Sequence, residues 1–491
     1  MKKNLRSAYS FGLTVILCLG TLAMSAVAQE VPPAPGAPKS GTIPAVKEVK
    51  LSNGLTVAVV ERTSVPLVTV QLLVKSGASS EDITRAGLAN LTASMLSKGT
   101  KTRSATQIAE AIEFLGGSLN TGAGWNNSIV NVTVTSDKVD EAMAILADVV
   151  LNPSFKQEEL DLLRSQALDG LKFSLKQPGF LSSYVASKYS FGEHPAGGTP
   201  ASLAAITRDD IVNFHADNFR PEKAVLIFVG DITMAAAETE AKKLFGSWRG
   251  PSSGSARAAL RGSTEKPAVS SEGLRRILVV DLPNSGQASV SYLKSLQGIG
   301  RQDRNFYPSS VLNSVLGGGY SSRLNQEIRI KRGLSYGAGS GFSWRDTKSN
   351  FSTRTQTKNE SAAEVAQLVM AEVKRLTDGA IEPAELTPRK SVLTGGFGRN
   401  LETTGGLAGA VSDLYSFGIP TTELNSFVSS VNGVTDTQIR QFAAKNLLGG
   451  DIIIVGDYSI FKDDLAKRFP GMKIEVIEAD KLDIGNEALV K

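Results

Sequence analysis

The strongest constraint on the fold is an internal repeat, because two apolar strand patterns end in the same triplet 226 residues apart. The first pattern covers residues 225–231 and the second covers residues 451–457, and each ends in Val-Gly-Asp. A helix-forming pattern follows each triplet. A strand–helix order that recurs at this distance predicts two duplicated domains of about 200 residues, rather than a solenoid of short units.

Each copy is predicted to have an α+β fold, because runs of helices alternate with strands of the hairpin type around a largely antiparallel sheet. Residues 49–60 predict a hairpin, with Asn53-Gly54 as its type I′ turn. The other main elements expected are helices over about 85–97 and 157–175 and strands over 335–343 and 350–357.

Shifts in composition set the expected domain limits. Residues 31–44 are rich in Pro, Gly and Ala, and residues 250–273 are rich in Ser, Gly, Ala and Pro, which is typical of linkers. The expected order is a signal peptide (1–28), a flexible lead-in (29–45), a first domain (46–249), a linker (250–274), a second domain (275–480) and a C-terminal tail (481–491).

The N-terminus has the pattern of an export signal. Lys2, Lys3 and Arg6 precede an apolar stretch over about residues 11–22, and Ala26-Val27-Ala28 forms a small-residue cleavage site. The apolar stretch is too short for a good membrane span, so a retained anchor is the less favoured alternative. We therefore expect the protein in the periplasm or cell envelope of a bacterium, with no membrane span after cleavage.

Cleavage after Ala28 changes two bulk properties. The net charge falls from +5 by three, to +2, and the sole cysteine, Cys18, is removed. The mature chain can therefore form neither a disulfide nor a thiolate zinc site. No basic run with interleaved aromatic residues is present, so the sequence predicts no nucleic-acid partner.

One segment of the second copy carries candidate chemistry. Gly317, Gly318 and Gly319 open a loop, Ser321 or Ser322 can cap the following helix, Leu324 and Ile328 share its buried face, and Gly333 ends it. Arg329 lies near the helix end and Tyr336 just beyond the turn, so both can point at one bound group. A guanidinium and a phenol are donors suited to a carbonyl or a developing oxyanion.

This segment resembles the second-domain signature of the pitrilysin/insulinase/mitochondrial processing peptidase family of zinc proteases. That signature reads L-G-G-G-x-S-S-R-L-x-x-x-I-R-x-x-x-G-L-x-Y, and the resemblance covers nearly the whole mature chain. It implies that Arg329 and Tyr336 hold the scissile region of a peptide. It also implies, more weakly, that residues 317–319 with Ser321 and Ser322 let the backbone approach that peptide.

The zinc motif of the same family is degenerate in this chain. Active members carry H-x-x-E-H on a helix of the first domain, and the aligned positions here are Asn90, Ala93 and Ser94. The third ligand aligns with Gly170, and only the neighbouring Asp169 keeps a carboxylate. An amide, a methyl group and a hydroxyl cannot make a tight zinc site, so we expect no metal and no cofactor in this chain.

Each of these residues also has a structural interpretation. The degenerate positions are expected to form a small polar patch on a solvated helix face. His194 and His215, the only two histidines, are not at ligand spacing and are expected to be structural. Taken singly, Arg329 and Tyr336 would be a surface ion-pair partner and a packing aromatic.

The resemblance implies a function for a chain that keeps the arginine–tyrosine pair without the zinc ligands. We expect the metal-free subunit of a two-subunit peptidase, with a homologous partner that supplies zinc and with peptides as substrates. The alternatives are a structural pseudopeptidase with no catalytic role and a peptide-binding or chaperone-like envelope protein.

Overall fold

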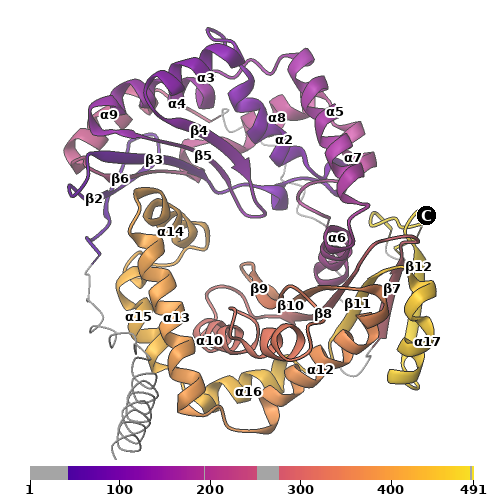
Figure 1. The fold of residues 1–491 in the computed structure, drawn as a ribbon. Helices are drawn as coiled ribbons and strands as arrows, with labels where there is room; N and C mark the ends of the chain where they lie inside the picture. Colours follow the sequence, from indigo (N-terminus) through magenta and orange to yellow (C-terminus); the bar gives the residue numbers. More distant parts are fainter. Residues whose placement is uncertain (1–42, 193, 251–275, 487–488, 491) are drawn as a thin grey trace, which may run out of the picture. The chain divides into compact units, whose positions relative to one another are not determined.

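Two six-stranded sheets organise the chain in the computed structural model, which describes residues 43–192, 194–250, 276–486 and 489–490 (Figure 1). The expected signal peptide, nearly all of the lead-in and the linker lie outside the described residues. The domain limits inferred from composition therefore stay predictions. The observed sheets are mainly antiparallel and packed by helices, so the predicted α+β class is confirmed.

The first sheet has the strand order β1-β2-β6-β3-β5-β4. All of its neighbouring strands pair antiparallel except β2 and β6, which are parallel. Its strands are β1 (Lys47–Lys50), β2 (Thr56–Glu61), β3 (Leu67–Val74), β4 (Ser118–Ala123), β5 (Ser128–Thr135) and β6 (Ala224–Gly230).

The second sheet has the order β12-β7-β11-β8-β10-β9, so five of its strands repeat the first sheet. Strands β6 and β11 run into the two Val-Gly-Asp triplets, and each is the third strand in the order of its sheet, as the internal repeat predicts. The sixth strand differs, because β1 precedes β2 and pairs antiparallel, whereas β12 pairs parallel with β7. The strands are β7 (Arg276–Asp281), β8 (Ala288–Gln297), β9 (Ala338–Trp344), β10 (Lys348–Thr357), β11 (Asp451–Gly456) and β12 (Lys473–Glu478).

Helices follow the strands in both halves. Those of the first half are α2 (Leu88–Met95), α3 (Ala105–Phe114), α4 (Val139–Leu151), α5 (Gln157–Ser174), α6 (Pro178–Phe191), α7 (Pro200–Ala205), α8 (Arg208–Asn218) and α9 (Met234–Phe245). Those of the second half are α10 (Phe306–Leu316), α11 (Arg323–Asn325), α12 (Ala362–Asp378), α13 (Pro383–Leu401), α14 (Thr404–Ser416), α15 (Glu423–Gly433), α16 (Asp436–Asn446) and α17 (Tyr458–Arg468).

Each sheet is covered on one face by its own helices and on the other by a helix from the opposite half. Val225, Ile227 and Val229 of β6 pack in one apolar cluster with Leu407 and Val411 of α14. In the same way, α6 packs on β8 and β11 of the second sheet (Figure 1). Burial on both faces explains why these central strands are continuous apolar runs instead of alternating ones.

Polar contacts reinforce this exchange of helices. The hydroxyls of Thr69 and Thr404 lie 2.8 Å apart in a buried hydrogen bond. The hydroxyls of Ser182 on α6 and Ser291 on β8 lie 3.0 Å apart, where α6 packs on the second sheet. Each hydrogen bond fixes one residue of a helix against one strand, so the register of helix on sheet is specified as well as its burial.

The predicted hairpin is present as β1 and β2, but its predicted turn type is wrong. A type I′ turn needs positive φ at both central residues, and here only Gly54 has it, at 95°. Asn53 instead uses its side chain, which donates to the carbonyl oxygens of Phe245 and Trp248 at 2.7 and 3.2 Å. A tertiary contact therefore selected the turn.

The remaining predicted elements agree with the observed ones to within a few residues. The long helix expected over 157–175 is α5, and the strands expected over 335–343 and 350–357 are β9 and β10. Among the residues that the structure describes, none of the helices combines the length and apolar character needed to cross a bilayer.

Candidate functional site

The glycines of the signature follow the end of α10, and Gly317 contacts β9. The N–H groups of Gly317 and Gly318 both donate to the carbonyl oxygen of Asn313, at 2.9 and 2.7 Å, and Ser340 N–H donates to Gly317 O at 3.2 Å. A Cβ on Gly317 would lie 2.3 Å from the Ser340 nitrogen, whereas a Cβ on Gly319 would meet nothing within 4 Å. Packing therefore requires glycine at 317 and leaves 319 open. The proposed substrate contact of these glycines stays a prediction.

The two signature serines are engaged within the protein, and neither caps the helix through its side chain. Ser322 occupies the N-cap position of α11, but its hydroxyl donates to Gly319 O at 2.6 Å, so the predicted side-chain cap is wrong. The Ser321 hydroxyl accepts a hydrogen bond from Arg389 at 2.8 Å. Both serines hold the loop in place, and their predicted contact with substrate stays a prediction.

The helix that carries Arg329 is irregular. After the short α11, residues Gln326–Ile330 form a π-helical turn, a widening that is frequent at functional sites. Leu324 and Ile328 are fully buried, as their spacing predicts. Gly333 ends the helix with φ of 65°, and Leu334 N–H donates back to Ile328 O at 2.9 Å. The predicted helix and its glycine end are therefore present.

Arg329 lies on the last turn of this helix and is half-buried, and Tyr336 lies three residues beyond Gly333 and is exposed. The central guanidinium carbon of Arg329 is 4.8 Å from the centroid of the Tyr320 ring, a cation–π contact. In the described part of the chain, no hydrogen bond or ion pair occupies that guanidinium. The Tyr336 side chain is 90% exposed. Both groups therefore keep their donor capacity for a bound molecule, and neither is a buried packing residue.

Two residues whose role was not predicted from the sequence hold this segment in position. Arg323 is 7% exposed and makes a two-pronged ion pair with Glu385 of α13, at 2.8 and 2.7 Å. Hydrogen bonding to Glu385 raises the pKa of the Arg323 guanidinium. Asn325 donates to Tyr320 O and accepts from Ala338 N–H at 3.3 Å, so it ties the loop to β9. Arg323 and Asn325 could have been recognised from the sequence, because both lie within the segment that resembles the family signature.

The degenerate zinc positions lie on α2 and α5, which contact each other. Asn90 and Gly170 are exposed, and Ser94 is half-buried. The expectation of a solvated patch is wrong for Ala93, whose side chain is fully buried in the protein interior. A Cβ on Gly170 would meet nothing within 4 Å, so no neighbour explains the absence of a side chain there.

These side chains do not fit a zinc ion. They offer one amide, one hydroxyl and no imidazole or carboxylate. Within residues 43–192, 194–250, 276–486 and 489–490, no group of three or more His, Cys, Asp or Glu side chains is placed to hold a metal. His215 Nε2 donates to Val150 O at 2.9 Å, and the ring packs against Phe155 and Phe219, which agrees with a structural role.

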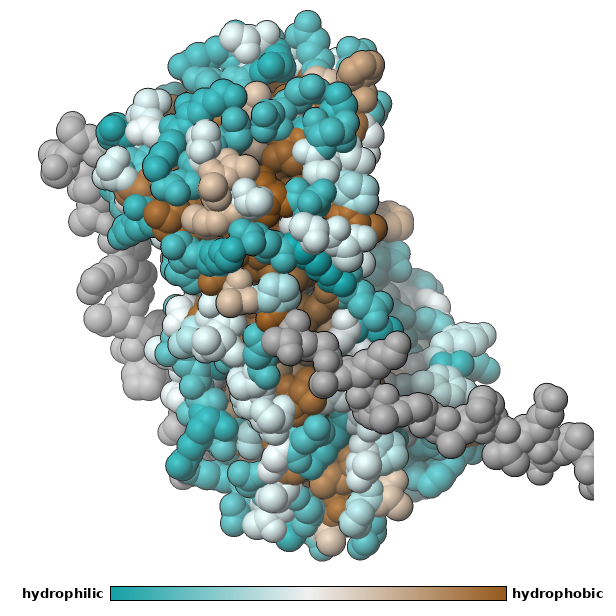
Figure 2. Space-filling model, turned by 90° about the vertical axis from the view of Figure 1, so that its left-hand side faces the viewer, coloured by the Kyte–Doolittle hydropathy of each residue, from teal (hydrophilic) through white to brown (hydrophobic). Residues whose placement is uncertain are grey.

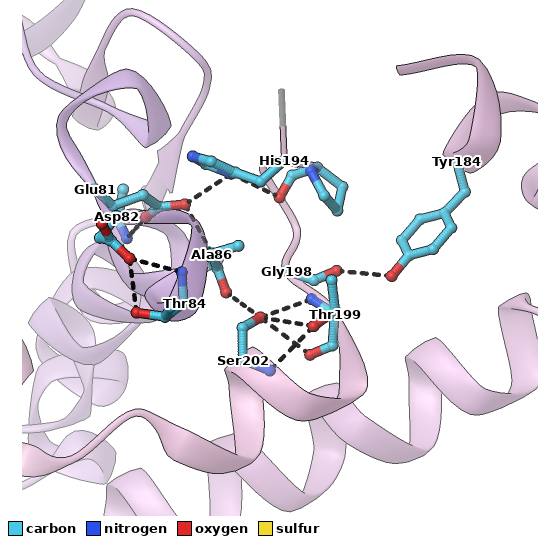
Figure 3. A network of polar contacts seen from close by, with 12 residues as sticks. Glu81, Asp82, Thr84, Ala86, Tyr184, His194, Gly198, Thr199 and Ser202 are labelled. Atoms are coloured by element: carbon cyan, nitrogen blue, oxygen red, sulfur yellow. Dashed lines mark hydrogen bonds and ion pairs between the residues drawn. The ribbon is translucent and has the colours of Figure 1, made fainter. Parts of the chain in front are cut away.

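The buried carboxylate of Glu81, whose role was not predicted from the sequence, fixes the start of α2. Figure 3 shows Glu81 beside His194. Glu81 accepts hydrogen bonds from the N–H groups of Gly87 and Ala89 at 2.7 and 2.6 Å, and its side chain is 0% exposed. Burial raises the pKa of Glu81 to about 8, although these hydrogen bonds oppose that change. His194 Nδ1 lies 3.6 Å from the same carboxyl, and burial lowers its pKa.

Two family models match this chain, over two separate segments. Residues 56–179, which include the degenerate zinc positions, match the model described as insulinase (peptidase family M16). Residues 205–393, which include the signature, match the model described as peptidase M16 inactive domain.

Similar proteins come from several bacteria. A protein named uncharacterized zinc protease from Mycobacterium leprae is 29% identical over 359 residues, 72% of this chain and 78% of its own length. A Rickettsia bellii protein of the same description is 29% identical over 334 residues, 67% of this chain and 77% of its own.

Solved structures show the same fold. The peptidase M16 inactive domain from Pseudomonas fluorescens has a TM-score of 0.72 and 26% identity, covering 84% of this chain and 98% of that one. A protease from Helicobacter pylori has a TM-score of 0.76, covering 84% of this chain and 100% of that one. At 19% identity it bears on the fold alone.

Proposed function

Because the chain belongs to the M16, or insulinase-type, peptidase family, we propose that it is the metal-free subunit of a two-subunit zinc peptidase. A homologous partner holds the zinc and its water, and this chain contributes donors to the bound peptide. The observation that carries the proposal is the combination of two sites. The zinc positions hold no ligand side chains, yet Tyr336 is exposed and Arg329 is partly exposed, with no ion pair among the described residues.

The chemistry of the pair suits the role proposed for it. Hydrolysis of a peptide bond builds negative charge on the carbonyl oxygen, and zinc in the partner would supply the activated water. The Arg329 guanidinium and the Tyr336 hydroxyl would donate to that oxygen and stabilise the tetrahedral intermediate. Tyr320 supports the arginine from one side through its ring, which orients the guanidinium without using its N–H donors.

Location and assembly belong to the same proposal. The signal-like N-terminus favours export, with the mature protein in the periplasm or cell envelope. The substrate would be a peptide in an extended conformation along a strand edge of the partner's first domain, where backbone groups can pair with it.

The test is co-expression with a homologue that has an intact H-x-x-E-H motif, followed by a peptidase assay of the purified complex. Arg329→Ala and Tyr336→Phe should each lower kcat by about 10²- to 10³-fold, since each removes one donor to the oxyanion. Lys331→Ala is the matched control, because Lys331 is an exposed cation on the same helix end that pairs with Glu327. Its activity should stay within about twofold.

Two outcomes would contradict the proposal. Unchanged turnover in both donor variants would exclude the catalytic role of the pair. A complex that forms but cleaves nothing would favour a structural pseudopeptidase. Binding of unfolded peptides by the isolated chain, with no partner recovered, would instead favour a chaperone-like envelope protein.

A further inference from the structure

An open pocket of about 560 Å³ lies in the second half, lined by residues of α10, α13, α14, α15 and the end of β9. Its volume falls within the range of small-molecule sites and far exceeds an ordinary packing void. Phe306 and Ser310 line it from the first turns of α10, whereas the signature follows the last turn of that helix. At 1.5 Å per residue, Phe306 and Ser310 lie about 17 and 11 Å from Gly317 along α10.

The walls of the pocket are aromatic. Phe397 and Phe427 stack with centroids 4.1 Å apart, and Phe306 meets Trp344 edge to face at 5.2 Å. Seen from the side on which α14 and α15 lie, hydrophobic residues interrupt the hydrophilic surface in patches (Figure 2). Aromatic rings offer both apolar area and a negative face that attracts cations.

Three charged groups enter this aromatic pocket. Arg301 is 7% exposed and is already engaged: its Nη2 lies 2.6 Å from Glu423, and its guanidinium lies 3.6 Å from the Phe306 ring centroid. Asp413 is only 3.8 Å from Arg301 Nε but keeps 55% of its side chain exposed. Two carboxylates face one arginine, and Asp413 is the one at the accessible side. Burial raises the pKa of Asp413, and Arg301 opposes that change.

The pocket also has open space beside Gly409 that no neighbouring atom fills. Gly409 of α14 lines it, and a Cβ at that position would meet nothing within 4 Å. Glycine within a helix is less stable than alanine, so neither local structure nor packing explains its presence. The absence of a side chain at 409 keeps this part of the pocket open.

We propose that this pocket binds an organic cation, with an ammonium or guanidinium group beside Asp413 and an apolar body against the rings of Phe397, Phe427 and Trp344. A carboxylate next to several ring faces is the arrangement that recognises such cations. The basis for the site is its own lining, and the proposal does not depend on the subunit role of the chain. The cation can come from a free amine or from a lysine or arginine side chain of a peptide.

The experiment is calorimetric titration of the full chain with 4-phenylbutylamine and with its neutral counterpart 4-phenylbutanol. We expect the amine to bind with Kd on the order of 0.1–1 mM and at least about tenfold more tightly than the alcohol. A blocked lysine dipeptide and the same dipeptide with norleucine form a second pair. Tighter binding of the lysine dipeptide than of the amine identifies a peptide as the source, and the reverse identifies a free amine.

Two variants localise the binding. Gly409→Leu should fill the pocket and abolish amine binding, whereas Gly398→Leu, another helical glycine with open surroundings, should bind as the unaltered chain does. Asp413→Asn should weaken amine binding about tenfold and leave alcohol binding unchanged. Equal binding of amine and alcohol, undiminished binding in a folded Gly409→Leu protein, or no binding by the unaltered chain would each overturn the proposal.

Discussion

Replacement of His215 tests whether burial lowers the pKa of this histidine and so makes the free energy of unfolding depend on pH. His215 on α8 stacks on Phe219 at 4.7 Å and meets the edge of Phe155 at 5.3 Å. Its Nε2 is 2.9 Å from Val150 O, and because a carbonyl only accepts, Nε2 carries the hydrogen of a neutral ring. Burial lowers the pKa of His215 to about 4.

The sign of the pH effect follows from which state binds the proton. Between pH 6.5 and about 4 the unfolded chain protonates this histidine and the folded chain does not, so stability falls as the pH drops through that window. Each pKa unit is worth about 1.4 kcal/mol, so a pKa lowered from 6.5 to about 4 bounds the loss at about 3.5 kcal/mol. Above about pH 7.5 this residue contributes almost no pH dependence, because the unfolded chain no longer protonates it either.

The assay is urea unfolding of the unaltered chain and of His215→Gln at pH 7 and pH 4.5, followed by circular dichroism. Glutamine can donate to Val150 O but does not titrate, so other titrating groups cancel in the comparison. The unaltered chain should lose about 2.5 kcal/mol more than the variant between the two pH values. An equal loss in both proteins would show that the His215 pKa is not lowered.

Three further predictions follow from packing, charge and metal chemistry. Gly317→Ala should cost about 1–3 kcal/mol of unfolding free energy because its Cβ would collide with the Ser340 nitrogen, whereas Gly319→Ala should leave the melting temperature nearly unchanged. Arg323→Ala should cost about 3 kcal/mol, since it leaves the Glu385 carboxylate without its two-pronged partner, and a loss below about 1 kcal/mol in urea unfolding would contradict this. The isolated chain should contain no stoichiometric zinc by elemental analysis, and a chelator should not shift its melting temperature.

Local patterns predicted the secondary structure well where one segment decides its own conformation. The hairpin, the long helix α5, the strands β9 and β10 and the glycine that ends the signature helix all follow from periodicity and turn residues. Predictions failed where a distant group intervened. Asn53 turns toward Phe245 and Trp248. The Ser322 cap failed for a local reason, because its hydroxyl donates to Gly319 O of its own loop.

The candidate site divides in the same way. Asn90, Ser94 and Gly170 could be recognised as incapable of holding zinc from their chemistry alone, since no fold supplies ligand atoms that the side chains lack. The accessibility of Arg329 and Tyr336 could not be predicted from the sequence, because exposure depends on what packs over a helix end. Burial of Glu81 likewise depends on a helix that begins several residues later.

The amino-acid sequence by itself determined the duplication, the α+β elements and the loss of the metal ligands, because these depend on residue type and on spacing within one segment. Only the tertiary structure decided that α14 covers the first sheet and α6 covers the second, and that rings from three helices and a strand line one pocket beside Asp413. Such arrangements bring together residues from separate segments, and an apolar face in a sequence does not state which other face will cover it.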